Sequence, residues 1–359
     1  MIYLIIIKNL FEIEIYFNKI IKIMDLSKKT SRTESDQFIK KTLSDKVDGR
    51  KYIDQNFDKN YWYLLGREDG ETNYIESKVS TNKHWGQCKL LFSEIQFLTY
   101  YLRPDIKNLI YVGAAPGNHI YALSHLFEDL TFHLYDTNLF DPRLKTLKNV
   151  NLYHKYFTDE DIEKHKNLNL KYMFVSDIRN LSVDKLTVNK RENEMKIWED
   201  MKLQESWVLS LKPIYSSLKF KLPYGSEDYN ISKFGKTVEY LDGQIFKQVF
   251  CPALSAESRL VVSKFEKRDW DLLSYERKMS YHNTVIREKA TFKNPLTGKN
   301  ENVYEERGLT NNFDSVCCYS ILCDYLEKIN KKQTVENVKI IFDYIFDNAL
   351  PNGSKDLLE

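Results

Sequence analysis

One segment constrains the fold of this 359-residue chain more than any other. It begins with a short apolar run at 109–112 and a turn with two glycines at 113–117. A helical pattern over 119–126 follows, and a second apolar run stops at Asp136. The order strand, glycine turn, helix, strand, acidic residue is typical of a βαβ unit. It predicts an α/β fold of the Rossmann-like kind, with a central, mostly parallel sheet flanked by helices.

Further segments extend this pattern along the chain. Apolar runs predict strands at 150–153, 171–175 and 259–262. Apolar spacing or composition predicts helices or mainly helical segments at 90–101, 192–209, 266–290 and 314–349. Strands that alternate with helices favour one large α/β domain.

The segment 214–222 reads as a strand with lysines on one side. Apolar positions 218, 220 and 222 alternate with Lys219 and Lys221, which is the two-residue period of a strand. Asp177 follows directly after the predicted strand at 171–175. Open α/β sheets place their chemistry at the carboxyl ends of such strands, so Lys219 and Asp177 are candidate site residues.

The composition permits a large core but gives the chain no overall charge that would attract nucleic acid. Hydrophobic residues make up 42%, and 53 Lys and Arg against 51 Asp and Glu give a formal net charge of +2. An RNA ligand would therefore need a local basic surface. The cysteines lack zinc-ligand spacing, so we expect buried or free thiols and no metal site. They are Cys88, Cys251, Cys317, Cys318 and Cys323.

The N-terminal residues are apolar but interrupted by charged side chains, and they lack a cleavage site. We therefore expect neither a membrane span nor a secretory signal. The chain from Met24 onward reads like an ordinary N-terminus, and we expect Met24 to be the native start, with 1–23 upstream of it. The expected organisation is a poorly ordered arm at 1–60, a main domain with helical C-terminal additions at 61–350, and a tail at 351–359.

The turn at 113–117 has the properties of a ligand site. Small residues let a ligand approach the backbone, and the following helix offers free N–H groups. Asp136 lies where an acid typically binds ribose hydroxyls. Because the spacing matches neither the dinucleotide turn nor the P-loop, S-adenosyl-L-methionine is the better ligand hypothesis. A simple tight turn is the alternative.

Two lysines and two carboxylates form a set with a chemical logic. A ribose 2′-hydroxyl is a poor nucleophile until it loses its proton, and a lysine can accept that proton only if its pKa is lowered. Lys219 is the candidate base, and Lys89 could supply a neighbouring cation. Asp177 and Glu257 could orient the two ammonium groups. Taken singly, each residue also has an ordinary explanation, as a capping acid, a strand lysine or a loop carboxylate.

Several motifs occur in a specific order along residues 61–329. They are Gly86-Gln87-Cys88-Lys89-Leu90-Leu91, the Gly-x-x-Pro-Gly-x-His turn ending at His119, Ser176-Asp177-Ile178-Arg179, Ser216-Ser217-Leu218-Lys219, Ser255-Ala256-Glu257-x-Arg259 and Tyr275-Glu276-Arg277-Lys278-Met279. In this order they resemble the poxvirus cap-specific mRNA 2′-O-methyltransferases, which also serve as the small, stimulatory subunit of the viral poly(A) polymerase.

The resemblance implies roles for individual residues. The catalytic tetrad would be Lys89, Asp177, Lys219 and Glu257. The contacts to S-adenosyl-L-methionine would be Gln87, Tyr111, Gly113, Ala115, Pro116, Gly117, His119, Asp136, Asn138, Phe157 and Asp177. The pocket for the methylated guanine of the cap would use Tyr74, Tyr224 and Glu276.

The chain departs from the family at several of these places. Asn138 stands where the family has an arginine near the cofactor, and Leu254 replaces a tyrosine beside Glu257. Ser226 stands where an aspartate would help to hold guanine, and Glu227 or Asp228 could compensate. None of these changes removes the tetrad.

The resemblance also implies partners and a location. They are m7G-capped mRNA and the catalytic subunit of a viral poly(A) polymerase, with no membrane, in the host cytoplasm and the virion. Two alternatives stay open. One is an RNA-binding processivity subunit of the polymerase without methyltransferase activity, and the other is a 2′-O-methyltransferase acting on RNA other than the cap.

Overall fold

The structure is a computed structural model that describes residues 55–56, 83–179, 190–224, 234–252, 254–287, 292–299 and 312–349. Tyr74, Met24, Ser226, Glu227 and Asp228 lie outside the described residues, as do the predicted tail and most of the predicted arm. From that arm, β1 (Gln55–Asn56) is described and pairs in parallel with β11 (Phe292–Lys293).

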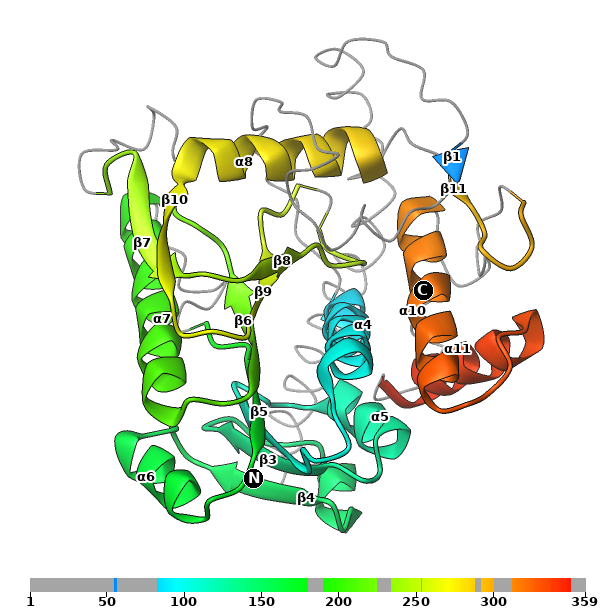
Figure 1. Cartoon of the computed structure of the whole chain (residues 1–359), viewed down its shortest axis with the longest axis horizontal. Helices are drawn as coiled ribbons and strands as arrows, with labels where there is room; N and C mark the ends of the chain where they lie inside the picture. The colour runs from blue at the N-terminus through cyan, green and yellow to red at the C-terminus, as the bar shows by residue number, and fades with distance from the viewer. Residues whose placement is uncertain are drawn as a thin grey trace, which may run out of the picture.

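A seven-stranded sheet forms the centre of the molecule (Figure 1). In spatial order its strands are β4 (Val150–His154), β3 (Thr131–Asp136), β2 (Asn108–Val112), β5 (Tyr172–Ser176), β6 (Tyr215–Phe220), β9 (Ser258–Val262) and β8 (Gln244–Phe246). The first five strands are parallel, and β9 is antiparallel to both β6 and β8. This confirms the predicted Rossmann-like, mostly parallel sheet. The strand order reverses between β2 and β5, which is where such sheets bind ligands.

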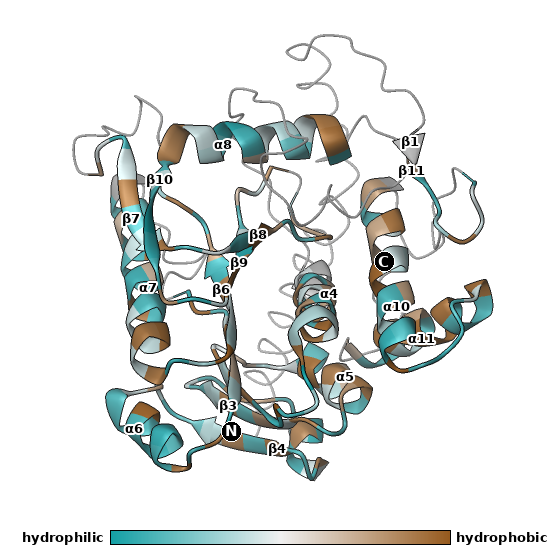
Figure 2. Cartoon of the chain, viewed as in Figure 1, coloured by the Kyte–Doolittle hydropathy of each residue, from teal (hydrophilic) through white to brown (hydrophobic). Residues whose placement is uncertain are grey.

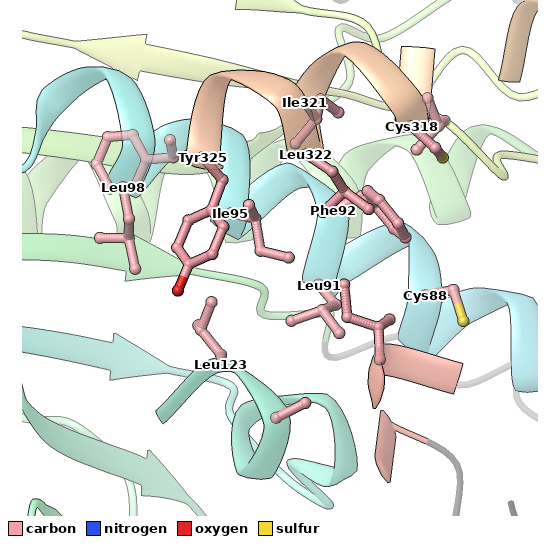
Figure 3. Close-up of a cluster of buried hydrophobic side chains, with 14 of the residues drawn as sticks. Cys88, Leu91, Phe92, Ile95, Leu98, Leu123, Cys318, Ile321, Leu322 and Tyr325 are labelled. Carbon is pink, nitrogen blue, oxygen red and sulfur yellow. The ribbon is translucent and has the colours of Figure 1, made fainter. Parts of the chain in front are cut away.

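Four helices cover one face of the sheet: α4 (Lys83–Tyr101), α5 (Asn118–Leu126), α10 (Asn312–Lys328) and α11 (Val335–Ala349). The first helix predicted from the sequence is α4, which packs against both α5 and α10. Figure 3 shows Leu91, Phe92 and Ile95 of α4 among side chains of α10 and α5. The Tyr325 hydroxyl of α10 donates to the Leu126 carbonyl at the end of α5 at 2.7 Å. Helix α4 therefore packs between α5 and α10.

The opposite face is covered by α6 (Asp159–Asn167) and α7 (Lys190–Leu211), with α8 (Leu272–Tyr281) at one end of the molecule (Figure 1). Figure 2 shows that α6 is largely hydrophilic and that α7 carries both hydrophilic and hydrophobic residues. The buried side of α7 includes Glu194, Gln204 and Glu205. These side chains have partners: Gln204 donates to the Lys219 carbonyl at 3.1 Å, and Glu194 pairs with Lys221 at 2.6 Å. The predicted helix at 192–209 is confirmed, and its buried side contains polar as well as apolar residues.

The prediction of a mainly helical segment at 266–290 was wrong at its start. Residues Lys267–Asp271 form β10, which pairs antiparallel with β7 (Thr237–Leu241). In the sequence Lys-Arg-Asp-Trp-Asp only Trp270 is apolar, so the strand gave no alternating signal. Its pairing with β7 and the burial of Trp270 decide the conformation. The segment then continues as α8 and a π-helix, η5 (His282–Ile286).

The remaining described element is a short 3₁₀ helix, η1 (Pro142–Thr146). Within the described part of the chain, no helix is both long and apolar enough to cross a bilayer. All five cysteines are buried and free, as predicted. Burial raises the pKa of the Cys88 thiol to about 12 and that of Cys251 to about 11. Both thiols are therefore protonated and poor nucleophiles at neutral pH.

Candidate active site

The four side chains of the predicted tetrad lie together where β5 and β6 end. Lys219 Nζ lies 3.3 Å from Asp177 Oδ1 and 3.6 Å from Glu257 Oε2. Lys89 Nζ, on α4, lies 2.5 Å from Glu257 Oε1. All four side chains are largely buried. The structure thus brings the four residues into one ionic cluster, although they come from α4, the residue after β5, β6 and the loop before β9.

Two arginines join this cluster, and the sequence analysis gave them no role of their own. Arg259 Nη2 lies 2.5 Å from Asp177 Oδ1, and its Nη1 donates to the Ser176 carbonyl at 3.0 Å. Arg179 Nη2 lies 3.8 Å from Glu257 Oε2. The spacing in the sequence could have indicated Arg259. It is two residues beyond Glu257, and alternate residues of an extended chain lie on the same side.

The two lysines differ in their electrostatic environment. Burial lowers the pKa of Lys219, and the cations of Arg179 and Lys89 lower it further, which outweighs the opposing effect of Asp177 and Glu257. Burial also acts to lower the pKa of Lys89, but there the neighbouring Glu257 carboxylate prevails and the net pKa is raised. Lys219 is therefore the lysine that more readily becomes neutral, and Lys89 stays a cation.

Both carboxyl groups stay ionised despite their burial. Burial alone would raise the pKa of Asp177, but Lys219 and Arg259 hold it below its usual value. The pKa of Glu257 is held well below its usual value because Lys219 and Lys89 outweigh the effect of burial. Two carboxylates thus face two lysines and two arginines, which leaves the cluster with local positive charge.

The glycine turn packs its backbone directly against this cluster. Gly113 has a φ of +80°, and a Cβ placed there would lie 2.9 Å from the Asp177 carbonyl carbon. Gly117 has a φ of +75°, and its Cβ would lie 2.9 Å from Leu144 Cδ1. Only glycine fits such positions without strain. At Gly113 the close approach is to the backbone after β5, and the predicted approach of a ligand to this turn stays a prediction.

A cavity of about 520 Å³ opens beside the turn and the ionic cluster. It is lined by six predicted cofactor residues and by Lys219 of the tetrad; the six are Gly113, Ala115, Asp136, Asn138, Phe157 and Asp177. Further lining residues, which the sequence analysis missed, are Val112, Tyr135, Thr137, Lys155, Tyr156, Ile178, Arg179, Leu203 and Trp207. Such a size and mixed lining are typical of small-molecule sites.

Asp136 occupies the rim of this cavity and is already hydrogen-bonded. Its Oδ2 accepts from the Ala115 N–H at 3.0 Å. Its Oδ1 accepts from the backbone N–H and the side-chain amide of Asn138, at 2.8 and 3.0 Å. Asn138, which stands where the resemblance implies an arginine, therefore helps to orient the carboxylate of Asp136.

The other predicted cofactor residues do not line the cavity. Tyr111 and His119 are buried behind the turn, where the Tyr111 hydroxyl donates to Glu94 at 2.6 Å and the His119 ring contacts Gln87 Oε1 at 2.9 Å. Pro116 is exposed and Gly117 is buried. Glu94, which the sequence analysis missed, connects Tyr111 and His119. A direct contact of these residues with a methyl donor stays a prediction.

Of the predicted cap residues, Tyr224 and Glu276 are described. Tyr224 is half-buried in the segment that follows β6, and Lys221 Nζ lies 4.2 Å from the centre of its ring. The Tyr224 backbone N–H donates to Glu194 at 3.3 Å. Glu276 lies on α8 and is only 3% exposed. One face of the Tyr224 ring therefore already carries a cation.

The fold and the site together define an α/β protein with a small-molecule cavity at the switch point of its sheet and a buried lysine at the cavity wall. The chain belongs to the poly(A) polymerase regulatory subunit family, whose model matches residues 56–350. It is 34% identical over 250 residues to a cap-specific mRNA (nucleoside-2′-O-)-methyltransferase of fowlpox virus, covering 63% of this chain and 75% of the relative. It is 30% identical over 253 residues to a myxoma virus protein of the same name, covering 65% of this chain and 72% of the relative.

Proposed function

We propose that the chain methylates the ribose 2′-hydroxyl of the first transcribed nucleotide in m7G-capped mRNA, with S-adenosyl-L-methionine as the methyl donor. The observation that carries the proposal is the position of Lys219. Its amino group has a lowered pKa, lies between two carboxylates and borders a cavity beside the glycine turn. The names of the fowlpox and myxoma virus relatives support the choice of substrate.

The cavity fits a nucleoside-type donor. It offers a carboxylate for ribose hydroxyls at Asp136, an aromatic ring at Phe157 and a second carboxylate at Asp177. S-adenosyl-L-methionine, when bound, supplies a methyl group activated by a sulfonium centre. Lys219 and Asp177 also line this cavity, so the reacting ribose oxygen has to enter beside them.

In this proposal, neutral Lys219 accepts the proton of the 2′-hydroxyl at Nζ. Asp177 and Glu257 accept hydrogen bonds from the resulting ammonium group and hold it in place. Lys89, which stays charged, fixes Glu257 from the other side. The positive charge of the cluster also suits an RNA substrate, whose phosphates attract cations.

The test is methyl transfer from labelled S-adenosyl-L-methionine to three RNAs of equal length: m7G-capped, uncapped, and structured with an internal target. We expect label on the capped RNA alone, located at the 2′-oxygen of its first nucleotide. Label on the structured RNA instead would favour an enzyme acting away from the cap. Labelling of none of the three would favour a binding subunit without this activity.

The donor assignment has its own test in Asp136→Ala. We expect this substitution to weaken binding of S-adenosyl-L-methionine, because the variant lacks the carboxylate that accepts from the ribose hydroxyls. Affinity for a cap dinucleotide should stay nearly unchanged. Calorimetry on the two ligands separately makes the comparison. Equal losses would indicate misfolding, and no loss for either ligand would refute the donor site.

The family match supports a second role. We propose that the chain also acts as a regulatory subunit of a viral poly(A) polymerase, bound to its catalytic subunit. Co-purification from infected cells tests the association, and the predicted location in the host cytoplasm and virion can be examined in the same material. Polyadenylation by the catalytic subunit with and without this chain then tests stimulation.

A further inference from the structure

Glu257 contacts three cations of the ionic cluster, although it lies in a loop and not in a helix or a strand. Its carboxylate lies near Lys89, Lys219 and Arg179, yet it precedes the first residue of β9 and has no strand partner. Within its own loop, its backbone N–H donates to Ser255 Oγ at 3.1 Å. The position of this carboxylate therefore depends on what holds the loop between β8 and β9.

Three side chains from α8, the π-helix η5 and the residue after it hold that loop by its carbonyl groups. The Tyr275 hydroxyl donates to the Ala256 carbonyl at 2.6 Å. The Asn283 amide donates to the Ser255 carbonyl at 2.9 Å, and Arg287 Nη2 donates to the Cys251 carbonyl at 3.1 Å. Two of these donors bind the two residues directly before Glu257, and the third binds Cys251 near the middle of the loop.

Two of these donors, Arg287 and Asn283, are held in place by further polar contacts. Arg287 forms a buried ion pair with Asp314 of α10, with Nη2 at 2.7 Å from Oδ2. Arg287 Nη1 also donates to Asn283 Oδ1 at 3.3 Å, so the Asn283 amide uses both of its ends. Asp314 in turn accepts from the Phe250 N–H at 3.3 Å. A π-helix is rare and often marks a functional site.

We propose that Tyr275 and Asn283 are positioning residues that set the place of the Glu257 carboxylate between the two lysines. The proposal rests on the proposed function, in which Glu257 belongs to the catalytic centre. Among the described residues, neither side chain forms a hydrogen bond or an ion pair with the cluster, and the Tyr275 hydroxyl also bonds Ser258 Oγ at 3.1 Å. Each acts through a carbonyl of the loop that carries Glu257.

The first variant is Tyr275→Phe, which removes one hydroxyl and keeps the ring. The matched control is Tyr240→Phe, because Tyr240 packs on the same ring of Phe220 and its buried hydroxyl has no hydrogen-bond partner among the described residues. We expect kcat of Tyr275→Phe to fall about 10- to 100-fold, as for a misplaced active-site group. The KM for capped RNA and the affinity for the methyl donor should stay near wild-type values. The control should retain the wild-type kcat.

The second readout is the pKa of Lys219, followed by NMR titration of the protein with isotope-labelled lysine. The Glu257 carboxylate raises the pKa of Lys219. If this carboxylate moves away from Lys219 in Tyr275→Phe, the pKa of Lys219 should fall. Tyr240→Phe should leave it in place. A loss of stability without repositioning would change neither this titration nor kcat per folded molecule.

Asn283→Asp provides an independent variant if Tyr275→Phe folds poorly. It keeps an acceptor for Arg287 but places an acceptor oxygen opposite the Ser255 carbonyl. We expect the same direction of change in kcat and in the Lys219 titration. Wild-type kcat and an unmoved Lys219 titration in both variants would overturn the positioning role. An inactive wild-type protein would count against the proposed function, and the titration would still decide the positioning role.

Discussion

At the scale of single residues, Lys219 and Lys89 show how one cluster gives two lysines different states. Both are mostly buried and both lie near Glu257. The pKa of Lys219 is nevertheless lowered and that of Lys89 is raised, because Lys89 lies 2.5 Å from Glu257, whereas Lys219 has only longer contacts and two cations nearby. A base and a permanently charged neighbour can therefore share the same carboxylate.

Lys219→Ala should abolish methyl transfer while leaving the fold and donor binding largely intact. Removal of a general base typically lowers the rate by about 10²–10⁴-fold. Lys219→Arg should fail as well, because arginine stays protonated and cannot accept the ribose proton. Single-turnover assays at pH 8, with circular dichroism as the folding control, measure both variants. Substantial activity in either one would mean that another group is the base.

Arg179→Gln should shift the pH dependence of methyl transfer. The active form has neutral Lys219, so the rate rises as pH increases through the pKa of Lys219. Arg179 lowers that pKa, and its replacement by an uncharged side chain should move the rising limb to higher pH. The matched control is Arg103→Gln. Arg103 pairs with Asp105 before the start of β2, whereas the ionic cluster lies near the other end of that strand. A limb that moves to lower pH, or equally in both variants, would contradict the electrostatic role of Arg179.

At the scale of elements, the turn between β2 and α5 lines the cavity and packs against the backbone of Asp177 in the ionic cluster. Gly113 N–H donates to the Tyr135 carbonyl at 2.9 Å, and the Asp177 N–H donates to the Val112 carbonyl at 2.9 Å. The turn is thus bonded to β3, and the last residue of β2 before it is bonded to the residue after β5. Any side chain at position 113 would push against the backbone that carries Asp177.

Gly113→Ala should lower stability and also displace Asp177. The left-handed conformation alone costs a non-glycine residue about 1–3 kcal/mol. Gly298→Ala is the matched control, because Gly298 has a φ of +66° with no atom within 4 Å of the added Cβ. Both variants should lose stability in urea unfolding. Only Gly113→Ala should also lose methyl transfer at temperatures where it is folded, and equal activity in the two variants would contradict the close-approach argument.

At the scale of the whole molecule, the sheet brings the proposed cap site and the proposed catalytic centre to the same end. Lys219 lies within β6, and Tyr224 follows that strand and is held by its backbone N–H bond to Glu194 of α7. Glu276 lies on α8, next to Tyr275, which holds the loop of Glu257. Lys221 over the Tyr224 ring shows that this ring is placed to contact a cation.

Tyr224→Ala should weaken binding of a methylated cap dinucleotide and leave binding of unmethylated GpppA nearly unchanged. N7-methylation gives guanine a positive charge, and a cation over an aromatic ring gains about 0.5–2 kcal/mol. A methylated guanine would have to displace the Lys221 ammonium group or stack on the other ring face. Fluorescence titration of wild type and variant with both dinucleotides makes the test. Equal affinity of the wild-type protein for the two would end the hypothesis.

The sequence by itself determined the βαβ unit, the mostly parallel sheet and the identity of the tetrad candidates. Strand ends, glycine turns and alternating lysines are local patterns, and a parallel sheet brings its carboxyl ends together without further information. The resemblance across several ordered motifs implied that Lys89, Asp177, Lys219 and Glu257 act together as one catalytic tetrad. A single motif would not have sufficed, because each residue alone has an ordinary explanation.

Only the tertiary structure decided which lysine has the lowered pKa, because that depends on distances between α4, β6 and the loop before β9. The tertiary structure also showed that Arg259 pairs with Asp177 and that Tyr111 and His119 are buried behind the turn. Burial and hydrogen-bond partners depend on packing between elements that are distant in sequence. The tertiary structure likewise made β10 a strand, because the pairing of Lys267–Asp271 with β7 outweighs the local pattern. Local periodicity determines which elements form, and contacts between distant elements determine what their side chains can do.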